Sequence, residues 1–261
     1  TELTGTGDAL GHLVGKEIYR FHAVTWPAML MALDIELPKM VFAHGWWTVD
    51  GEKMSKSKGN VIDPAQVVSE VPLDALRYYL LREMPFGADG DFSLARLKAK
   101  TAGELGNNFG NLHLRLLTMV NKYSQGPFVK RGAMTMFAAL SGKREDIDGA
   151  YRDFEFHRAL EIVYQGLASI NLAIDKTAPW KLAKEGKTEE VLDFLSDCIY
   201  SLGLLAVWLS PVCPIACAKL LETFGVIGDP GKAVEQLLGQ EPLRLASRSD
   251  PLFPKETIEK R

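Results

Sequence analysis

The sequence predicts an α/β unit with parallel strands, followed along the chain by an all-α helix bundle. A short apolar run at 12–15, a segment of helical periodicity at 16–33 and a second apolar run at 40–43 succeed one another as strand, helix and strand. Beyond about residue 93 the apolar residues have mainly helical spacing. A βαβ unit builds a parallel sheet, and amphipathic helices in series pack as a bundle.

Local signals mark the elements that follow. Asp63-Pro64 opens one helix and Pro72-Leu73-Asp74 opens the next, because proline is favoured at the first helical position. Glycine, proline and aspartate then break the periodicity, so we place a boundary between residues 85 and 95. Beyond it we expect helices at approximately 94–123, 154–174, 179–184, 188–209 and 214–224. From Gly225 onward we expect a tail on the surface, with a short helix near 233–238.

Composition excludes several classes of protein. The 261 residues are 47% hydrophobic, which is enough for a sizeable core, and the formal net charge is −3. A general basic coat for nucleic acid is therefore excluded, and any polyanion must bind at local patches. No unbroken apolar run of about 18 residues and no signal peptide is present, which favours a cytoplasmic protein that does not bind membranes.

Cys198, Cys213 and Cys217 form no disulfide framework. The spacing of Cys213 and Cys217 could suit zinc, but they lack histidine partners, and free cysteine is usually a small buried apolar residue. We therefore predict no metal site in this chain. The chain begins with Thr1-Glu2, without a methionine, and we expect a fragment of a longer protein.

The segment at 49–60 reads VDGEKMSKSKGN and concentrates lysines and serines beside glycines. Such a loop can bring mobile positive charge to phosphates, and it follows the second strand, near the edge where ligands of parallel sheets bind. Asp50-Gly51 is also a good turn dipeptide, however, and composition alone favours a solvated charged hairpin.

The order of the residues favours the phosphate-binding interpretation. The run at 53–57 is identical to the KMSKS signature, and here the chain resembles the class I aminoacyl-tRNA synthetases. The resemblance implies that the loop binds the triphosphate of ATP, supplied with Mg²⁺, and helps to form an aminoacyl-adenylate. It makes Lys56 catalytic, with Lys53 in support. The ATP-binding residues that it implies in this loop are Lys53, Met54, Ser55, Lys56 and Ser57.

The predicted helix at 16–33 carries Phe21, His22 and Trp26. His22 and Trp26 are four residues apart and share a face, whereas Phe21 points about 100° away from His22. Aromatic residues on a helix more often form core. An aromatic wall also suits a thioether side chain, because sulfur packs well against rings.

Several segments resemble the methionyl-tRNA synthetases in particular, namely GKEI at 15–18, FH at 21–22, WPAML at 26–30 and HGW at 44–46. The resemblance implies that Phe21, His22 and Trp26 help to bind methionine. It also places Gly15 and Glu17 at ATP, near the adenosine. Glu17 stands where many members have aspartate, and an acidic residue in a first helical turn is also favoured by the helix dipole.

Polar and apolar residues separate on the predicted helix at 94–123. Asn107, Asn111 and Arg115 fall on one side, opposite an apolar face formed by Phe109, Leu112, Leu116 and Val120. Asparagine can bond a base edge and arginine can bond or stack, although a plain solvated face is the alternative. Trp180 follows a helix-starting proline, where it can stack on an unpaired base or wedge between helices.

Both features resemble the anticodon-binding bundle of the same family. The resemblance implies that Asn111, Arg115 and Trp180, with Asn107 in support, bind the CAU anticodon of methionine tRNA. The implied fold is an α/β Rossmann-like catalytic-domain remnant followed by an all-α helix-bundle anticodon-binding domain. Its segments are the remnant at 1–62, a helical connection at 63–92, the bundle at 93–228 and the tail at 229–261.

The other signature of the family, of the form His-x-Gly-His, is absent. The resemblance therefore implies the carboxyl-terminal part of an enzyme that activates methionine, with an N-terminal catalytic half as its partner. Any structural zinc would belong to that half. Two alternatives are another class I synthetase, for leucine, isoleucine or valine, and a non-catalytic tRNA-binding module. A purely structural helical protein is disfavoured by the independent motifs.

Overall fold

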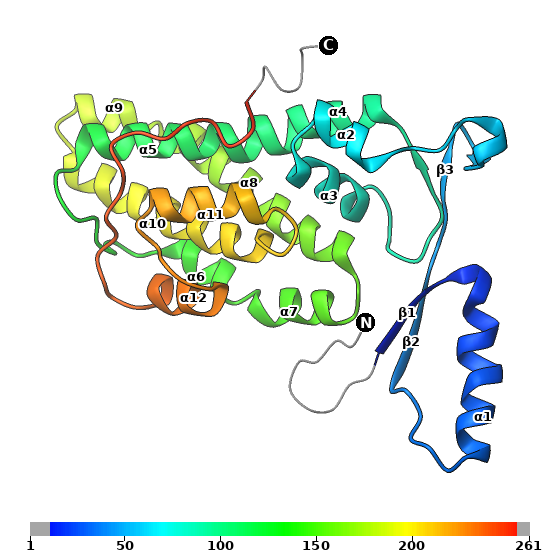
Figure 1. The fold of residues 1–261 in the computed structure, drawn as a ribbon. Coiled ribbons are helices and arrows are strands. Elements are labelled where there is room, and N and C mark those ends of the chain that lie inside the picture. The colour runs from blue at the N-terminus through cyan, green and yellow to red at the C-terminus, as the bar shows by residue number, and fades with distance from the viewer. Residues whose placement is uncertain (1–10, 255–261) are drawn as a thin grey trace. The chain divides into compact units, whose positions relative to one another are not determined.

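The computed structural model describes residues 11–254, which divide into two compact units (Figure 1). The first unit contains the chain up to Ile62 together with Glu83–Ser93. The second contains Asp63–Arg82 and the chain from Leu94 onward. The chain thus leaves the first unit, forms two helices of the second, and returns to the first for one strand before the remaining helices begin.

The first unit contains the predicted strand, helix and strand. Strands β1 (Gly11–Gly15) and β2 (Met40–His44) pair in parallel, with Gly11 opposite Met40 and Gly15 opposite His44. Between them run η1 (Lys16–Ile18), η2 (Phe21–Thr25) and α1 (Trp26–Ala32). The βαβ prediction is therefore confirmed.

The predicted helix at 16–33 is helical from Lys16 to Ala32, but it is not a single regular α-helix. η1 is a 3₁₀ turn and η2 is a π-helix, in which the N–H of Trp26 bonds to the carbonyl of Phe21. Pro27 follows directly and has no N–H to continue an α-helical ladder, which gives a physical reason for the wider turn at this point.

A second sheet in this unit was not predicted. β3 (Trp47–Val49) pairs antiparallel with β4 (Glu52–Lys53) and parallel with β5 (Gly90–Phe92), and the 3₁₀ turn η3 (Lys56–Lys58) follows β4. The glycines and prolines before β5 conceal a strand of only three residues, because its partner lies more than 40 positions away in the sequence.

The second unit is helical throughout most of its length. α8 and α10 are its longest helices, and α5 and the shorter α11 lie against α10 (Figure 1). Its elements are α2 (Pro64–Glu70), α3 (Leu73–Arg82), α4 (Leu94–Lys100), η4 (Thr101–Gly110), α5 (Asn111–Tyr123), α6 (Thr135–Ser141), α7 (Arg144–Arg152), α8 (Phe156–Thr177), α9 (Pro179–Lys184), α10 (Thr188–Leu209), α11 (Pro214–Thr223) and α12 (Pro230–Leu238).

The core of this unit is built around α10. This helix is buried from Leu195 to Leu209 and contacts α5, α6, α8, α9, α11 and α12. By length and composition α10 is apolar enough to cross a membrane, but 83% of its most apolar window is buried inside the unit. That burial is usual for the central helix of a bundle.

The expected surface tail is wrong for the part of it that the structure describes. Leu237 on α12 packs against Gly203 of α10, where an added Cβ would lie 2.9 Å from a Leu237 methyl group. Leu243 and Phe253 are also buried and belong to the same apolar core. The last part of the described chain therefore completes the core.

Candidate functional sites

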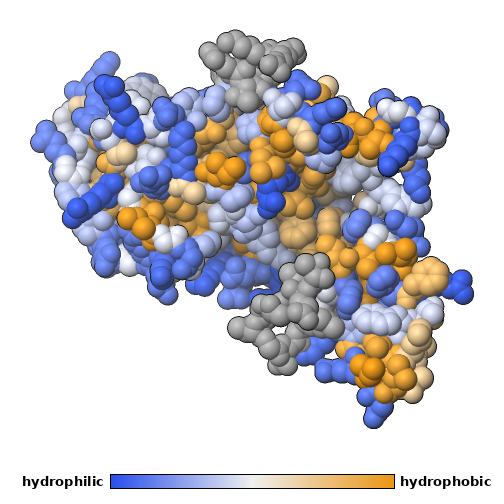
Figure 2. Space-filling view, in the orientation of Figure 1, coloured by the Kyte–Doolittle hydropathy of each residue, from blue (hydrophilic) through white to orange (hydrophobic). Residues whose placement is uncertain are grey.

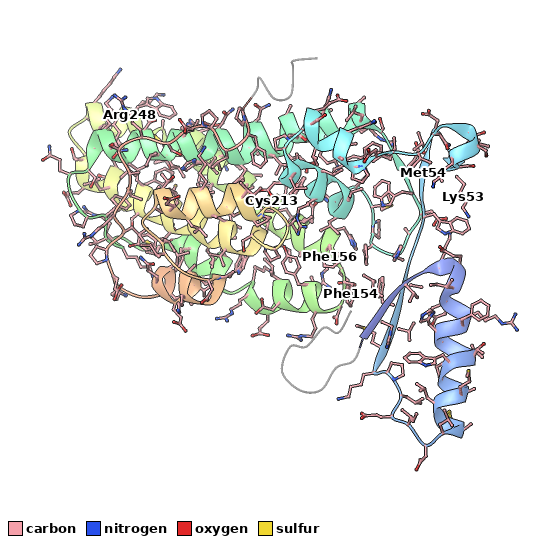
Figure 3. All side chains as sticks on the ribbon, viewed as in Figure 1. Lys53, Met54, Phe154, Phe156, Cys213 and Arg248 are labelled. Atoms are coloured by element: carbon pink, nitrogen blue, oxygen red, sulfur yellow. The ribbon has the colours of Figure 1, made fainter. Side chains whose placement is uncertain are left out.

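The lysine-rich segment begins with a tight hairpin. Val49 pairs with Glu52, and the two turn residues Asp50 and Gly51 have φ angles of 54° and 75°. Two successive positive φ angles are typical of the turn that joins two-residue hairpins. The predicted Asp50-Gly51 turn is confirmed, and the lysine-rich loop, in which Figure 3 labels Lys53 and Met54, follows the turn.

Asn60 closes this loop. Its side-chain oxygen accepts from the N–H of Ser55 at 2.8 Å, and its amide nitrogen donates to the carbonyl of Lys53 at 3.3 Å. Gly59 ends η3 with a φ of 68°, which favours glycine. The backbone of the loop is thereby held while its longer side chains extend into solvent.

The exposed side chains of the loop are suited to an anion. Among residues 11–254, Lys56 has no acidic group within salt-bridge distance, whereas Lys58 pairs with Glu52 at 2.9 Å. The hydroxyl oxygens of Ser55 and Ser57 lie 2.7 Å apart. Lys56 and this pair of hydroxyls can bind phosphate oxygens without first breaking an ion pair.

Trp46 connects the loop to the segment after β1. The ammonium groups of Lys16 and Lys53 lie 4.2 and 4.5 Å from its ring centre. Its indole N–H donates to the Glu17 carboxylate at 2.8 Å. This hydrogen bond lowers the pKa of Glu17, with Lys53 contributing further.

Asp89 completes this cluster. It forms an ion pair with Lys16 and accepts the backbone N–H of Trp46 at 2.8 Å. Gly45 allows the close approach, because a Cβ there would lie 2.2 Å from the carbonyl oxygen of Ala88. Sequence reasoning did not assign roles to Lys16, Trp46 or Asp89, although the position of Trp46 just after β2 was a signal.

Gly15 and Glu17, which are predicted to lie at ATP, are close to each other in the structure. A Cβ added to Gly15 would lie 2.6 Å from a Glu17 carboxylate oxygen, so glycine leaves the room that this carboxylate occupies. Glu17 is exposed and faces Trp46.

His22 and Trp26 come together as their spacing predicted, with ring centres 6.3 Å apart. His12 on β1 joins them at 4.7 Å from Trp26, and its buried Nε2 has no hydrogen-bond partner among residues 11–254. Sequence reasoning missed His12, because its relation to Trp26 depends on how β1 packs beside the helical segment. Phe21 is 60% exposed and stands outside this cluster.

The polar and apolar faces of η4 and α5 are separated as predicted. Phe109, Leu112, Leu116 and Val120 are all buried, while Asn107 and Asn111 are exposed. The Asn111 amide donates to the Asn107 side-chain oxygen at 3.3 Å. Asn107 lies in η4, which is a π-helix, and Asn111 begins the α-helix that follows.

Arg115 and Trp180 complete this polar face. The guanidinium of Arg115 lies 5.5 Å from the centre of the Trp180 ring and donates to Asp175 at 2.8 Å. Trp180 is 37% exposed, which disfavours the interhelical wedge. The structure thus brings together residues from η4, α5 and α9, and it adds Asp175 on α8, which sequence reasoning missed.

The described residues contain no cluster of three or more histidine, cysteine or acidic side chains that could hold a metal. Cys198, Cys213 and Cys217 are all buried, as predicted. Burial raises the pKa of each thiol, which keeps it in the neutral form that binds metals poorly.

Comparisons with known proteins agree on one family. The family model described as tRNA synthetases class I (M) matches residues 5–117. The methionine–tRNA ligases of Campylobacter jejuni and Bacillus subtilis are each 43% identical to this chain over 94% of its length. The chain spans 40% and 38% of the length of these two relatives.

A solved structure supports the same relationship. The methionyl-tRNA synthetase of Mycobacterium tuberculosis, in complex with methionyl-adenylate, superimposes with a TM-score of 0.86 at 33% sequence identity. The match covers 94% of this chain and 50% of that one. The likeness therefore extends through both units and beyond the part matched by the family model.

Proposed function

The chain belongs to the methionyl-tRNA synthetase family of class I, and from this premise we propose that it contributes to the ATP-dependent attachment of methionine to its tRNA. In this proposal the first unit is the end of a Rossmann-like catalytic domain, and the helical unit contains the anticodon-binding domain. The observation that carries the proposal is that one chain contains both an exposed KMSKS loop and a polar surface on the helical unit. We call this surface the Asn-Asn-Arg-Trp surface, after Asn107, Asn111, Arg115 and Trp180.

We assign the lysine loop to ATP. In the proposed first step a methionine carboxylate oxygen attacks the α-phosphorus, a new O–P bond forms, and the bond to the β-phosphate breaks to release pyrophosphate. Lys56, supported by Lys53, stabilises the negative charge that develops on the leaving phosphates. Ser55 and Ser57 offer donors to the same oxygens. Mg²⁺ is expected to arrive with ATP, since substrate phosphates are among its preferred ligands.

We assign the His22 and Trp26 cluster to methionine. Trp26 offers an aromatic surface to the thioether, and His12 contributes a buried polar atom that a ligand can satisfy. The exposed Phe21 contributes if it turns toward the ligand on binding.

An N-terminal catalytic half is part of the proposal, because the chain spans 40% or less of these curated relatives. The first unit exposes several large apolar side chains along α1 and the segment after it, including Met29, Met31 and Leu33, each at least 58% exposed (Figure 2). Exposed apolar side chains that gather on one element commonly mark an interaction surface. We propose that the N-terminal half covers it.

Pyrophosphate exchange tests the catalytic assignment. We expect no methionine-dependent exchange from this chain alone, because it supplies only the lysine loop and part of the amino-acid pocket. Substantial exchange from the purified chain would contradict the proposal that methionine activation needs an N-terminal catalytic half. In a preparation that also contains the N-terminal half, dependence on leucine, isoleucine or valine in place of methionine would identify a different class I synthetase.

Titration with methionine tRNA tests the anticodon assignment. Trp180→Ala is expected to weaken binding by about 1 to 3 kcal/mol, the usual contribution of one base stacked on an aromatic ring. Trp180→Phe retains a stacking surface and serves as the matched control. An unchanged titration for Trp180→Ala would show that this tryptophan does not stack on the anticodon.

A further inference from the structure

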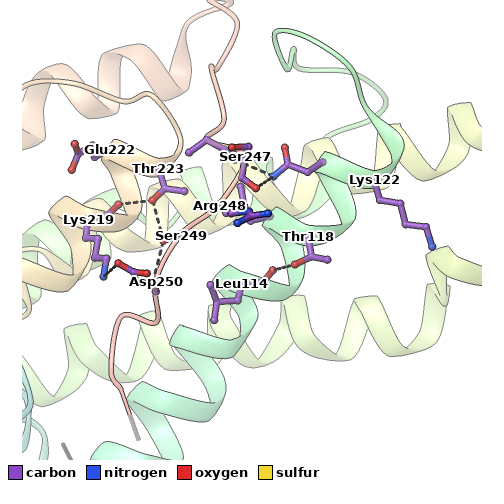
Figure 4. A pocket seen from close by; sticks show the side chains of 13 residues that line it. Leu114, Thr118, Lys122, Lys219, Glu222, Thr223, Ser247, Arg248, Ser249 and Asp250 are labelled. Carbon is purple, nitrogen blue, oxygen red and sulfur yellow. Dashed lines mark hydrogen bonds and ion pairs between the residues drawn. The ribbon is translucent and has the colours of Figure 1, made fainter. Parts of the chain in front are cut away.

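A hollow in the helical unit lies beside the Asn-Asn-Arg-Trp surface, along the same helix α5. It has a volume of about 860 Å³ and is lined by α5, α11 and the chain from Ala246 to Asp250 (Figure 4). None of its lining residues belongs to the lysine loop, the His22 and Trp26 cluster or the anticodon surface proposed above. We call it the C-terminal pocket.

The wall formed by the C-terminal segment is fixed in place. The Asn121 amide donates to the carbonyls of Ala246 and Ser247 at 3.0 and 3.2 Å. Phe253, just beyond the pocket, is buried in the core. The backbone on both sides of Arg248 is therefore held, so its guanidinium can be directed at a ligand with less loss of conformational entropy.

The two sides of the pocket differ in charge. Lys219 on α11 lies 3.9 Å from Asp250, and Glu222 stands on the same side (Figure 4). Away from that pair lie Lys122 on α5 and Arg248 on the C-terminal segment, and neither has an acidic group within salt-bridge distance among residues 11–254. Two cations without carboxylate partners favour an anionic ligand at that side.

The α5 side of the pocket continues the proposed anticodon surface. Asn111, Arg115, Thr118 and Lys122 follow one another at spacings of four, three and four residues, which places them along one stripe of the helix. Lys122 lies about 10 Å along the axis from Arg115, at about 1.5 Å per residue. A single strand whose base meets Trp180 can therefore extend its backbone toward the pocket.

We propose that the C-terminal pocket binds a backbone phosphate of the single-stranded RNA next to the anticodon, with Arg248 as its main ligand and Lys122 in support. The proposal rests on the proposed tRNA-binding function. The contact is to the phosphate, so it adds affinity and position but does not select a base.

Salt-dependent binding of an anticodon stem–loop RNA tests this proposal. Arg248→Ala is expected to weaken binding about three- to tenfold, as loss of one charge-assisted contact does. It should also reduce the slope of log K against log salt concentration by about 0.7, the value for one single-strand phosphate. The loss should be equal for a CAU loop and for a loop with another anticodon.

Two variants serve as controls. Arg152→Ala removes an exposed arginine from α7, which lies across the helical unit from α5 in Figure 1, and should leave binding and the salt slope unchanged. Trp180→Ala should weaken binding with little change in the salt slope, because it removes stacking and not charge. Equal losses of RNA affinity for Arg248→Ala and Arg152→Ala would show that only the net charge of the protein matters, and they would overturn the proposal.

Neutral methylphosphonate substitution, one phosphate at a time, identifies the contact. One position next to the anticodon should weaken the wild-type chain and have no further effect on Arg248→Ala, as coupled partners do in a double-mutant cycle. Additive losses at every position would overturn the pocket. If Trp180→Ala weakens binding and Arg248→Ala does not, the pocket is wrong and the proposed function stands. If the wild-type chain binds no tRNA, both the phosphate-binding role of the pocket and the proposed tRNA-binding function are contradicted.

Discussion

Trp46 brings groups of opposite charge to one side chain. Its ring faces the ammonium groups of Lys16 and Lys53, and its edge donates to Glu17. Because Lys53 begins the lysine loop and Glu17 lies near the proposed adenosine site, the indole couples the two ends of the proposed ATP site. Each contact lies at the surface, so its contribution to stability is small and its value is positional.

Trp46→Phe tests this arrangement. Phenylalanine keeps an aromatic face for the lysines but removes the N–H that stabilises the charged carboxylate, so the pKa of Glu17 should rise toward its ordinary value. A carboxyl NMR titration measures this directly. Trp47→Phe, one residue further, should leave the pKa of Glu17 unchanged, and a similar rise in both variants would contradict the assignment.

His113 links burial to pH dependence. It is fully buried on α5 beside Phe224, neither ring nitrogen has a hydrogen-bond partner in the described part of the chain, and burial lowers its pKa from 6.5 to about 4. Between about pH 4 and pH 6.5 the His113 imidazole therefore binds a proton in the unfolded chain but not in the folded chain. The contribution of His113 to the free energy of unfolding is therefore greatest above pH 6.5. It falls by about 3 kcal/mol in total as the pH falls toward about 4.

His113→Leu should remove most of this acid sensitivity. Urea unfolding at neutral pH and near pH 4.5 gives the loss of stability on acidification for each protein, and the loss should be smaller in the variant. His157→Leu, at a half-buried histidine of α8, is the control and should retain the larger loss. Equal losses in wild type and His113→Leu would show that another group governs the acid response.

At the scale of elements, α6 shows why some helices escaped prediction. Met134, at its N-cap, has a φ of 49° and provides no side-chain cap. The cap comes from α10, where the Asp197 carboxylate accepts the N–H groups of Met136 and Phe137 at 2.9 and 2.8 Å. A helix whose start depends on a residue about 60 positions away leaves little local signal.

Asp197→Leu should therefore destabilise the helical unit by about 2 to 5 kcal/mol, because two backbone donors at the start of α6 lose a charged acceptor. Urea unfolding measures the change. Asp193→Leu, one turn earlier on α10, removes a partly exposed partner of Arg131 and should cost less than about 1 kcal/mol. Equal costs would contradict the capping role.

The sequence predicted features that rest on neighbours along the chain. The bounds of α9 and α10 agree with expectation, since Pro179 opens the one and a long apolar run marks the other. The Asn107 and Asn111 stripe was found for the same reason. Features built by distant pairs were missed, including β5 opposite β3 and the contacts of His12 and Asp89. Hydrophobic spacing along one element carries no information about such partners.

At the scale of the whole molecule, the two units differ greatly in burial. Among the described residues, the buried apolar side chains of the first unit are Val14 and Phe92. The helical unit instead has one continuous core that runs from α3 to Phe253. The free energy needed to open the backbone should therefore be low in the first unit and high in the second.

Hydrogen exchange followed by mass spectrometry tests this difference in the isolated chain. Amides of β1 and β2 should exchange through a local opening, long before those of α8 and α10, which require the helical unit to unfold. α12 serves as an internal control, because its packing on Gly203 predicts exchange close to that of α10. Adding the proposed N-terminal half should slow exchange in β1 and α1 and leave α10 unchanged, since more of the described exposed apolar side chains belong to the first unit and α10 is buried. Exchange of both units in one cooperative step, or no change in β1 on adding that half, would contradict this account.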